Sequence, residues 1–511
     1  MTTHDLGRSV LLTHGVITDG VTTSSSMAVR DGRVVWTGPD DDATPSDFDE
    51  VVDLENRVVT PVFVDAHVHI SDTGQALAGI DLAGTRSVTE ALDRLSAAAA
   101  QRPGRPVFAY SWDETEWHEQ RAMTAAELDR ACGGAEVYAT RIDMHSASAS
   151  SALVDRAGAW SSPGSDGTGL VARDAHHLVR EAHRGGVSQD DRAHFISTAM
   201  TAALAAGIGV LHEMGAPVLT SEEDLLAVVA AAREPGAPRV VPYWGELVED
   251  VAQARALADR LGVRGLAGDL NVDGSIGSRT AALREPYEDA LGLSGFTYLT
   301  PEQVATHVTA CTLAGLQAGF HVIGDAGMDC AVDGVRQAAR EVGIERIRLA
   351  RHRFEHAELC HAEHIDALAE IGVVASVQPA FDAFWGGDDG MYAARLGLQR
   401  ALAANPLADL VGSGVQVALG SDSPVTPFAP WAAVRACVDH HAPAQALDAA
   451  TALRLHLAGG HAAAGETGGA LTPGSEASYV IWDCAGGLDE ALHEPAALRT
   501  VLQGRVVHDV W

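Results

Sequence analysis

The sequence predicts an α/β protein built as a (β/α)8 TIM barrel. Three observations support this prediction. Eight short apolar runs alternate with alanine- and leucine-rich stretches of helical spacing, several of these runs end in histidine or aspartate, and both chain ends are rich in short strands. A strand and a helix that alternate eight times are typical of such a barrel, whose active site lies at the C-terminal ends of its strands.

The first apolar run, residues 62–70, contains the triplet His67-Val68-His69. Successive side chains of a strand point to opposite faces, so His67 and His69 point the same way. Two imidazoles side by side at the end of a buried strand form a clamp for a metal ion. For this triplet alone, two structural or solvent-facing histidines are the alternative. Further ligand-type residues at the ends of later runs favour the metal site.

The other strands follow in order along the chain. They are predicted at residues 208–213, 239–243, 270–273, 319–323, 353–356, 372–377 and 415–422. Stretches of helical spacing lie between most of them, for example residues 301–314. His321, His356 and Asp422 each stand at or near the end of one run. The barrel is therefore expected to span residues 61–455, with its polar side chains gathered at one end.

Two parts of the chain depart from the barrel pattern. Residues 1–60 and 456–511 are typical of short strands and turns, with Asp31-Gly32 as a hairpin signal. Between the first two barrel strands, residues 71–200 form a connection that is too long to be structureless. Because it leaves the C-terminal end of the first strand, we expect an inserted subdomain that lies over the active-site mouth.

The composition is that of a large soluble enzyme. The chain has 511 residues, of which 47% are hydrophobic, and so can bury a sizeable core. Its net charge of -34 argues against nucleic acid and anionic membrane surfaces as partners. It has no apolar run of about 18 residues that could span a membrane, and no apolar core of a secretory signal. The six cysteines have no paired spacing, which predicts reduced thiols and a cytoplasmic location.

Five short motifs resemble those of a known family. They are Val-Asp-Ala-His-Val-His at residues 64–69, Asp-Gly-Ser-Ile-Gly-Ser-Arg-Thr-Ala at 273–281, His-Val-Ile-Gly-Asp-Ala at 321–326, Phe-Glu-His-Ala at 354–357 and Gly-Ser-Asp-Ser-Pro at 420–424. Together they resemble the metal-dependent amidohydrolase superfamily, and the second motif is the marker of its YtcJ-like (amidohydrolase 3) branch. The likeness covers essentially the whole chain. It is specific for the family and weak for the substrate.

This resemblance implies an arrangement of the chain ends and a function. In relatives both ends join into one small β-sandwich beside the barrel, so residues 1–60 and 456–511 are expected to form it. The implied function is hydrolysis of carbon–nitrogen bonds other than peptide bonds, of the amide, cyclic amide or carbamate type. A metal-activated water would be the nucleophile. The expected partner is a small-molecule substrate, and a homodimer is left open.

The resemblance also gives each polar strand-end residue a role. His67, His69 and His321 would bind a divalent metal, with Zn²⁺ expected. Asp422 would hold or deprotonate the nucleophilic water and then protonate the leaving nitrogen. His356 would bind a second metal or polarise the carbonyl oxygen. Taken singly, His321 is as well explained as a core histidine and Asp422 as a helix cap or turn residue, but their joint occurrence in the family's order favours the metal site.

One position departs from the family pattern. Many relatives carry a lysine four residues before the aspartate of the Asp-Gly-Ser run, and that lysine, once carbamylated, bridges two metals. Here the residue is Asp269. Its shorter side chain would reach a metal only if the strand lay closer or a water intervened. The sequence therefore predicts one tightly held metal, with a bridged pair left open.

Three further residues are candidates for substrate contact. Trp112 and His145 belong to the predicted insertion, and Arg279 could hold a substrate carboxylate through two hydrogen bonds. Each has an ordinary alternative, a strand residue for the first two and an ion pair with one of the many acids for Arg279. His212 and Glu213, at the end of the second strand, are expected to orient a metal ligand.

Two other functions are compatible with the same residues. A deaminase would use the same site on an aminated heterocycle. A barrel that binds a small molecule without turnover is the alternative outside the enzymes. The presence of Asp422 argues against the second, because loss of the proton-handling acid is the simplest route to an inactive relative.

Overall fold

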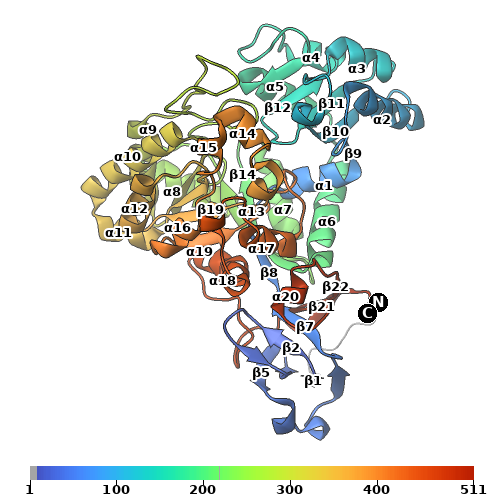
Figure 1. The fold of residues 1–511 in the computed structure, drawn as a ribbon, viewed down its shortest axis with the longest axis vertical. Helices are drawn as coiled ribbons and strands as arrows, with labels where there is room; N and C mark the ends of the chain where they lie inside the picture. The colour runs from blue at the N-terminus through green and yellow to red at the C-terminus, as the bar shows by residue number, and fades with distance from the viewer. Residues whose placement is uncertain (1–8, 218) are drawn as a thin grey trace.

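Eight parallel strands form the centre of the computed structural model, which describes residues 9–217 and 219–511. The strands are β8 (Phe63–Val68), β14 (Ile208–Gly215), β15 (Arg239–Trp244), β16 (Gly265–Leu266), β17 (Gln317–Val322), β18 (Arg353–His356), β19 (Val374–Val377) and β20 (Val417–Leu419). Each strand pairs with the next along the chain, and helices cover the outside of the sheet (Figure 1). The predicted (β/α)8 barrel is confirmed.

The helices between the strands pack their apolar faces on the barrel. The main ones are α7 (Glu222–Ala231), α8 (Val251–Leu261), α9 (Pro301–Ala314), α10 (Asp325–Val342), α12 (Ala362–Ile371) and α17 (Pro430–Val438). Phe320 and Phe354 of the strands share one buried cluster with Val308 and Leu368 of the helices. Aromatic and β-branched residues favour strands, and alanine and leucine favour helices. The residues that are buried in each element are therefore also those whose intrinsic propensity favours it.

The first and last strands meet at their C-terminal ends and complete the barrel. The backbone N–H of Asp422 donates to the carbonyl of His67 at 2.8 Å. The buried carboxylate of Asp65 accepts bonds from the N–H and the hydroxyl of Ser421, at 2.9 and 2.5 Å. These contacts fix the two strand ends that carry His67, His69 and Asp422.

The fourth strand differs from the prediction. Sequence analysis placed it at residues 270–273, whereas the paired strand is β16, which is two residues long and ends at Leu266. Gly268 has a φ of +91°, a left-handed value that favours glycine and turns the chain out of the strand. The chain then runs beside β17, where Asn271 forms a bridge with His321. This course brings Asp269 into the end of the barrel.

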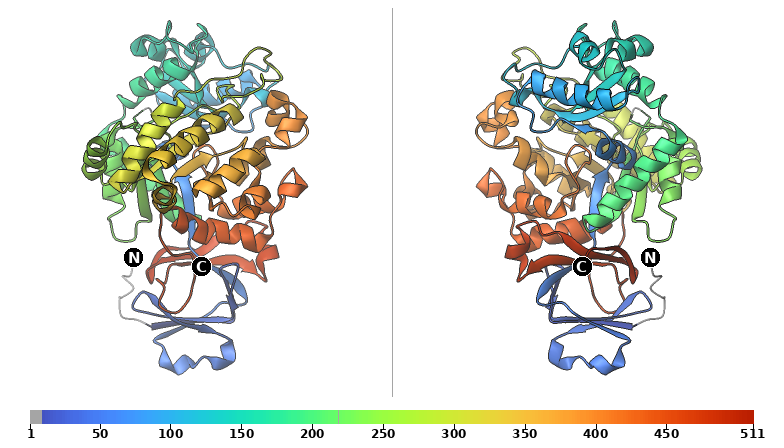
Figure 2. Two further views of the ribbon diagram at one scale, coloured as in Figure 1. Left: turned by 90° about the vertical axis from the view of Figure 1, so that its left-hand side faces the viewer. Right: turned by 90° about the vertical axis from the view of Figure 1, so that its right-hand side faces the viewer.

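Both chain ends build the β-sandwich that the family resemblance implies. One sheet contains β1 (Ser9–Thr13), β4 (Ser26–Arg30), β5 (Arg33–Gly38) and β6 (Glu50–Asp53). The other contains β2 (Val16–Thr18), β3 (Thr23–Ser24), β7 (Arg57–Pro61), β21 (Tyr479–Ala485), β22 (Ala497–Leu502) and β23 (Arg505–Asp509). Leu12, Val34, Ile481 and Val501 share their common core. Figure 2 shows this sandwich at the end of the molecule remote from the insertion.

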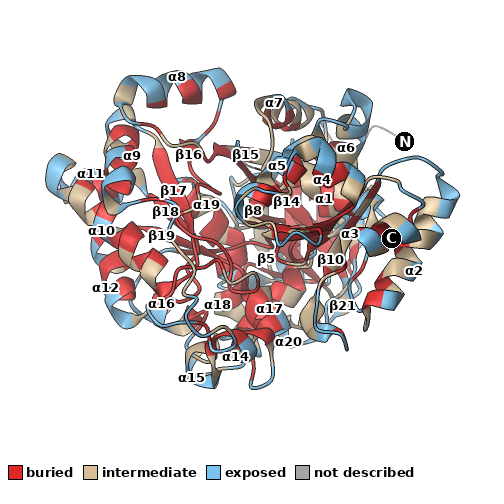
Figure 3. Ribbon diagram, turned by 90° about the horizontal axis from the view of Figure 1, so that it is seen from above, coloured by how far each residue is buried: buried red, intermediate tan, exposed pale blue. Residues whose placement is uncertain are grey.

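The segment after β8 forms the predicted inserted subdomain. It begins with α1 (Ile70–Ala78) and contains a five-stranded sheet of β9 (Ile80–Asp81), β10 (Val107–Trp112), β11 (Val137–Arg141), β12 (Ser146–Ala149) and β13 (Leu170–Ala172). Its helices are α2 (Val88–Gln101), α3 (Ala125–Ala131), α4 (Ser151–Ala157) and α5 (Arg173–Arg184), and α6 (Gln189–Ala205) leads back to β14. Seen from above, α5 lies over the barrel beside β8 and β14 (Figure 3).

Two further predictions concern the chain as a whole. Within the described ranges, no helix combines the length and the apolar character needed to cross a membrane. All six cysteines fall within those ranges and carry free thiols, and five of them are buried.

Candidate metal centre

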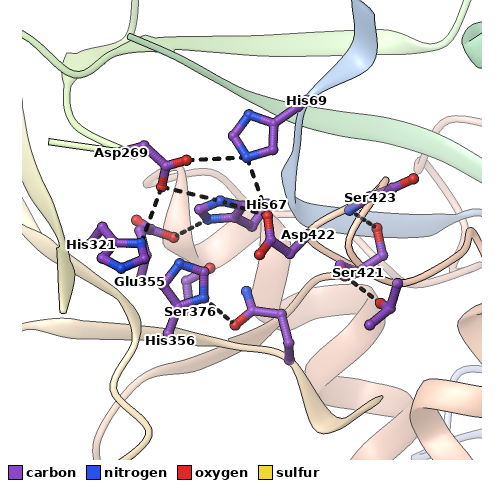
Figure 4. A network of polar contacts seen from close by, with 12 residues as sticks. His67, His69, Asp269, His321, Glu355, His356, Ser376, Ser421, Asp422 and Ser423 are labelled. Carbon is purple, nitrogen blue, oxygen red and sulfur yellow. Dashed lines mark hydrogen bonds and ion pairs between the residues drawn. The ribbon is translucent and has the colours of Figure 1, made fainter. Parts of the chain in front are cut away.

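Six side chains converge at the C-terminal end of the barrel (Figure 4). They come from the ends of five strands and are His67, His69, Asp269, His321, His356 and Asp422. Within this set, three overlapping groups of three each bring their ligand atoms within 4.8 Å of one another. Asp269 belongs to two of these groups. The structure thus brings together every residue for which metal binding was predicted from the sequence, and places Asp269 among them.

Asp269 lies between the histidines. Its Oδ1 is 3.5 Å from His67 Nε2 and 3.7 Å from His321 Nδ1, and its Oδ2 is 3.1 Å from His69 Nε2. Asp422 Oδ1 lies 3.3 Å from His67 Nε2 and 3.2 Å from His69 Nε2. Sequence analysis allowed Asp269 to reach a metal if the strand lay closer, and these distances show that closer approach to the histidines. The chain itself leaves the strand early and carries the carboxylate inward.

The imidazoles are oriented by bonds on their outer nitrogens. His67 Nδ1–H donates to Glu355 Oε2 at 2.9 Å, and His356 Nδ1–H donates to Gln378 Oε1 at 2.8 Å. His321 is held in the same way, with its Nε2 3.3 Å from a backbone carbonyl. Each bond directs the other ring nitrogen toward the centre, where it can offer a lone pair to a metal once it has lost its proton. Histidines that bind metals in proteins are held in this manner.

Glu355 is itself held by a buried ion pair. Arg353 Nε donates to its Oε1 at 2.5 Å, and Arg353 Nη2 donates to its Oε2 at 3.0 Å. Arg353 Nη1 also donates to His212 Nδ1 at 3.1 Å, so His212 helps to orient a ligand through two intermediate residues. Glu213, for which the same role was predicted, instead accepts the backbone N–H of Ile70 at 2.8 Å, at the start of α1.

Buried charges set the proton affinities at the centre. Burial alone would lower the pKa of His67, but the carboxylates of Asp422 and Asp269 outweigh it and raise that pKa to about 10. Burial would raise the pKa of Asp422, but His67 and His69 hold the pKa of that carboxyl below its usual range. The carboxylates therefore stay ionised, and any metal ion must displace protons from the imidazoles to bind.

His356 and Asp422, the two predicted catalytic residues, share an uncommon backbone. Their φ angles are +70° and +56°. Residues other than glycine rarely adopt this left-handed region, and those that do gather at functional sites, where the surrounding structure enforces the conformation. His356 also has a neutral ring, because burial and the nearby charge of His321 lower its pKa to about 3.

The chemistry of the cluster fits a divalent cation. Among the described residues, His67 Nε2 and Asp269 Oδ1 are buried side-chain atoms without a hydrogen-bond partner. Each such atom costs about 1–3 kcal/mol, which a shared cation would offset. Four imidazoles and two carboxylates suit Zn²⁺ or a similar transition metal better than Mg²⁺, which prefers oxygen ligands.

Of the residues predicted to contact the substrate, His145 lies at the pocket and Trp112 does not. His145 lines the pocket over the metal cluster, where its ring centroid is 5.1 Å from that of His321. Trp112 does not reach the pocket. It is 1% exposed, and its indole N–H donates to the carbonyl of Ala139 at 2.8 Å inside the insertion. The proposed substrate contact of Trp112 is therefore corrected to a core position, because the apolar ring packs within its own subdomain.

The predicted contact of Arg279 with a substrate carboxylate is also wrong. Its guanidinium forms two hydrogen bonds with the carboxylate of Asp289, at 3.0 and 2.7 Å. Arg395 donates to the same carboxylate at 2.5 Å. The structure thus shows the ion pair that was the structural alternative, and the engaged guanidinium stabilises a loop beside the insertion.

The Asp-Gly-Ser motif joins the insertion to the barrel. Asp143 Oδ2 accepts bonds from the hydroxyls of Ser275 and Ser278, both at 2.8 Å. Arg141 Nη1 lies 3.2 Å from the same oxygen. Gly277 leaves room for this arginine, since a Cβ there would lie 2.4 Å from its Nη1. The branch motif therefore anchors the subdomain that covers the pocket.

Sequence reasoning missed Glu355, Gln378 and Asp143. Glu355 had a signal, because a carboxylate inside a buried strand next to His356 needs a partner. Gln378, which directly follows the seventh predicted strand, had the same kind of signal. Asp143 had none, since its serine partners lie 132 and 135 residues further along the chain.

Comparisons with known proteins agree with this geometry. The protein YtcJ of Bacillus subtilis is 25% identical, over 95% of this chain and 96% of its own. The N-substituted formamide deformylase of Arthrobacter pascens is 23% identical, over 94% of each chain. The crystal structure of an uncharacterized metal-dependent hydrolase from Pyrococcus furiosus superposes with a TM-score of 0.71 at 25% identity, covering 93% of this chain and 98% of that one.

The family is shown by a match that spans almost the whole chain. A family model described as "Amidohydrolase family" matches residues 50–508. That range includes the barrel, the insertion and all six residues of the metal cluster. The chain belongs to the amidohydrolase family.

Proposed function

We propose that the protein is a metal-dependent hydrolase that cleaves carbon–nitrogen bonds other than peptide bonds, of the amide, cyclic amide or carbamate type. One observation carries this proposal. Buried imidazoles are fixed through their outer nitrogens by Glu355, Gln378 and a backbone carbonyl, while their inner nitrogens face two ionised carboxylates. Family membership and a relative named for deformylation of N-substituted formamides support an amide-type bond.

The ligand groups suggest how metal would be held. His67, His69 and Asp269 form one group, Asp269, His321 and His356 form another, and Asp422 joins His67 and His356 in a third. We propose that these side chains would hold Zn²⁺, and Asp269 belongs to two of the three groups. When bound, such an ion supplies Lewis-acid activation of a water and of the scissile carbonyl.

The chain's own residues would move the proton. Asp422 lines the pocket and is ionised, so it accepts a proton from the attacking water and then donates it to the leaving nitrogen. His356 is neutral, with Nδ1–H bound to Gln378, and so offers Nε2 as a ligand. His145 Nδ1–H is bound to the carbonyl of Asp143 at 2.7 Å, which orients its ring toward the substrate position.

We also propose the class of partner and the location of the protein. We propose a small-molecule substrate, because the metal cluster is reached through a pocket beneath the insertion. The net charge of -34 supports neither nucleic acid nor an anionic membrane as a partner. The six free thiols support a cytoplasmic location. A homodimer is tested by light scattering coupled to size-exclusion chromatography.

The decisive experiment combines metal analysis with a substrate screen. Protein loaded with Zn²⁺ is assayed against N-acyl amino acids, hydantoins, carbamates and aminated heterocycles, with chelated protein as the control. We expect hydrolysis of one amide-type class that depends on metal. Ammonia release from a heterocycle alone would favour the deaminase, and binding without turnover of any class would favour the non-catalytic barrel.

A further inference from the structure

Two adjoining pockets meet at the metal cluster, and their walls are unlike. One wall is apolar and aromatic and contains Ile276, Phe381, Trp385, Met391, Tyr392 and Val425. The other is basic and contains Arg173, His176, His177 and Arg180. Both walls meet at the same site residues, namely His145, His321, His356 and Asp422. A molecule bound at the metal cluster would therefore contact both walls.

The basic wall is one face of helix α5. Arg173, His176, His177 and Arg180 stand at positions i, i+3, i+4 and i+7, which share one side of a helix. This helix lies over the barrel beside β8 and β14 (Figure 3). In a chain with 69 acidic and 35 Lys and Arg residues, a helix face of arginine and histidine turned toward the site is a local reversal of charge.

Arg180 is fixed within this wall. It is 5% exposed, its Nη2 donates to the carbonyl of Met144 at 2.6 Å, and its Nε lies 3.4 Å from the Tyr138 hydroxyl. His176 Nε2 lies 2.8 Å from the same hydroxyl. Burial, together with the charge of Arg180, holds the pKa of His176 well below its usual range. The wall thus presents a rigid cation beside a neutral imidazole.

Arg173 stands at the rim of the same wall. It is exposed, and its guanidinium lies 4.2 Å from the centre of the Phe296 ring. This contact holds the charged group in place while it stays accessible to solvent. Two carboxylates, Asp72 and Asp143, also line this pocket. Asp143 is engaged by Arg141, Ser275 and Ser278. The charge of Asp72 acts on Arg180 and offsets part of the charge of α5, which leaves Arg173 as the exposed cation of this wall.

The apolar wall is built against His356. The Phe381 ring is nearly parallel to the imidazole, at 12° and a centroid distance of 5.9 Å. Trp385 packs on Phe381 at 4.9 Å. Such an apolar surface suits contact with an aromatic or bulky aliphatic group, because apolar surface leaves water there without any polar group losing a partner.

We infer that the substrate is an amide with an apolar or aromatic group on one side of the scissile C–N bond and a carboxylate on the other. The carboxylate lies against Arg173 and Arg180 of α5, and the apolar group lies against Phe381 and Trp385. Arginine pairs well with carboxylates through charge-assisted bonds. Hydrolysis adds water across the C–N bond and yields a carboxylic acid and an amine. This inference rests on the proposed hydrolase function and specifies its substrate class.

The test uses two matched pairs of probes. Phenylacetylglycine and benzylsuccinamic acid each join a phenyl group and a carboxylate through an amide, in opposite directions, and each is compared with its neutral primary amide. Dissociation constants are measured by calorimetry on Zn²⁺-loaded Asp422→Asn protein, in which turnover is blocked. Hydrolysis rates are measured on the Zn²⁺-loaded wild type. We expect at least one acid to bind about tenfold more tightly than its amide, the gain of a charge-assisted bond.

Three variants locate the origin of this preference. Arg173→Gln and Arg180→Gln should each reduce the ratio between acid and amide, while the affinity for the amide stays unchanged. Arg130→Gln, which removes an exposed charge from α3 of the same subdomain, should leave the ratio unchanged. If Arg180→Gln fails to fold, the acid-to-amide ratio of Arg173→Gln is the deciding measurement, because Arg173 is exposed and its replacement disturbs no buried contact.

The outcomes separate the inference from the proposed function. Equal binding of acid and amide, no binding of either pair, or a preference that survives both α5 variants would overturn the inference. If amides are hydrolysed with no preference for the acids, the hydrolase stands and the inference falls. If the acids bind in an α5-dependent manner and no amide is ever hydrolysed, the anion site stands and the hydrolase falls.

Discussion

At the residue scale, Asp422 should separate metal binding from chemistry. Asp422→Asn keeps the shape and one oxygen of the side chain but removes the proton acceptor. We expect retained metal and a turnover reduced by roughly 10²–10⁴-fold, the usual worth of acid–base help. Elemental analysis and kcat measure the two effects. A rate near that of the wild type would show that another group, such as Asp269 or His356, carries the proton.

Asp269 should matter for metal content. Because its carboxylate belongs to two ligand groups, Asp269→Ala should lower the number of bound metal ions per chain below that of the wild type. Elemental analysis after gel filtration measures this number, and Asp269→Asn, which keeps one oxygen, should lose less. Unchanged stoichiometry in Asp269→Ala would restore the expectation drawn from side-chain length alone.

Glu355 should tune metal affinity without touching the metal. Glu355→Gln weakens the acceptor for His67 Nδ1–H, and loss of such a partner typically costs about 10–100-fold in affinity. Competition with a chelator measures the dissociation constant. Glu358→Gln is the matched control, since this nearby buried carboxylate bonds the hydroxyl of Tyr392 rather than an imidazole. An equal loss in both variants would indicate a general disturbance of the site.

The sequence predicted residues whose role follows from strand position. His67, His69, His321, His356 and Asp422 stand at strand ends, and a barrel gathers strand ends at one rim. It could not predict residues whose role depends on a distant partner. Arg279 meets Asp289 and Trp112 packs into the core of the insertion, and nothing local distinguishes these outcomes from contact with a substrate.

At the element scale, the fourth strand is the one whose predicted position differs from the structure, and the reason is again a feature that the apolar pattern does not show. The other predicted runs are four to nine residues long, and each matches a strand of the barrel. β16 has two residues, and Gly268 turns the chain immediately afterwards, so the apolar signal of residues 270–273 belongs to the segment beyond the strand. That irregular segment is what places Asp269 among the histidines.

The contact between the insertion and the barrel gives a prediction for these elements. Ser275→Ala with Ser278→Ala removes both hydroxyl donors to Asp143. We expect faster amide hydrogen exchange in β11 and β12, because the insertion is then held less firmly over the barrel. Ser197→Ala, an exposed serine of α6, is the control. Unchanged exchange in the double variant would show that the remaining contacts hold the subdomain alone.

At the scale of the whole molecule, buried neutral histidines tie helices to the barrel. His352 Nδ1 accepts the backbone N–H of Ala318 at 2.8 Å, and His307 Nδ1 accepts that of Val248 at 3.2 Å. Burial lowers the pKa of His352 to about 3 and that of His307 to about 4. A proton on either Nδ1 would remove the acceptor and place a charge in the core.

The pH dependence of stability follows from the sign of these shifts. In the unfolded chain these histidines titrate near 6.5, so below that pH the unfolded state binds more protons, and stability falls as the pH drops toward 4. His352→Asn keeps an acceptor oxygen but cannot titrate in this range. The melting temperature of metal-free His352→Asn should therefore fall less between pH 7 and pH 5 than that of the wild type. Replacement of the exposed His194 by asparagine should leave the wild-type slope unchanged. Parallel curves for His352→Asn and the wild type would contradict the assignment, because a histidine neutral in the fold must make stability depend on pH.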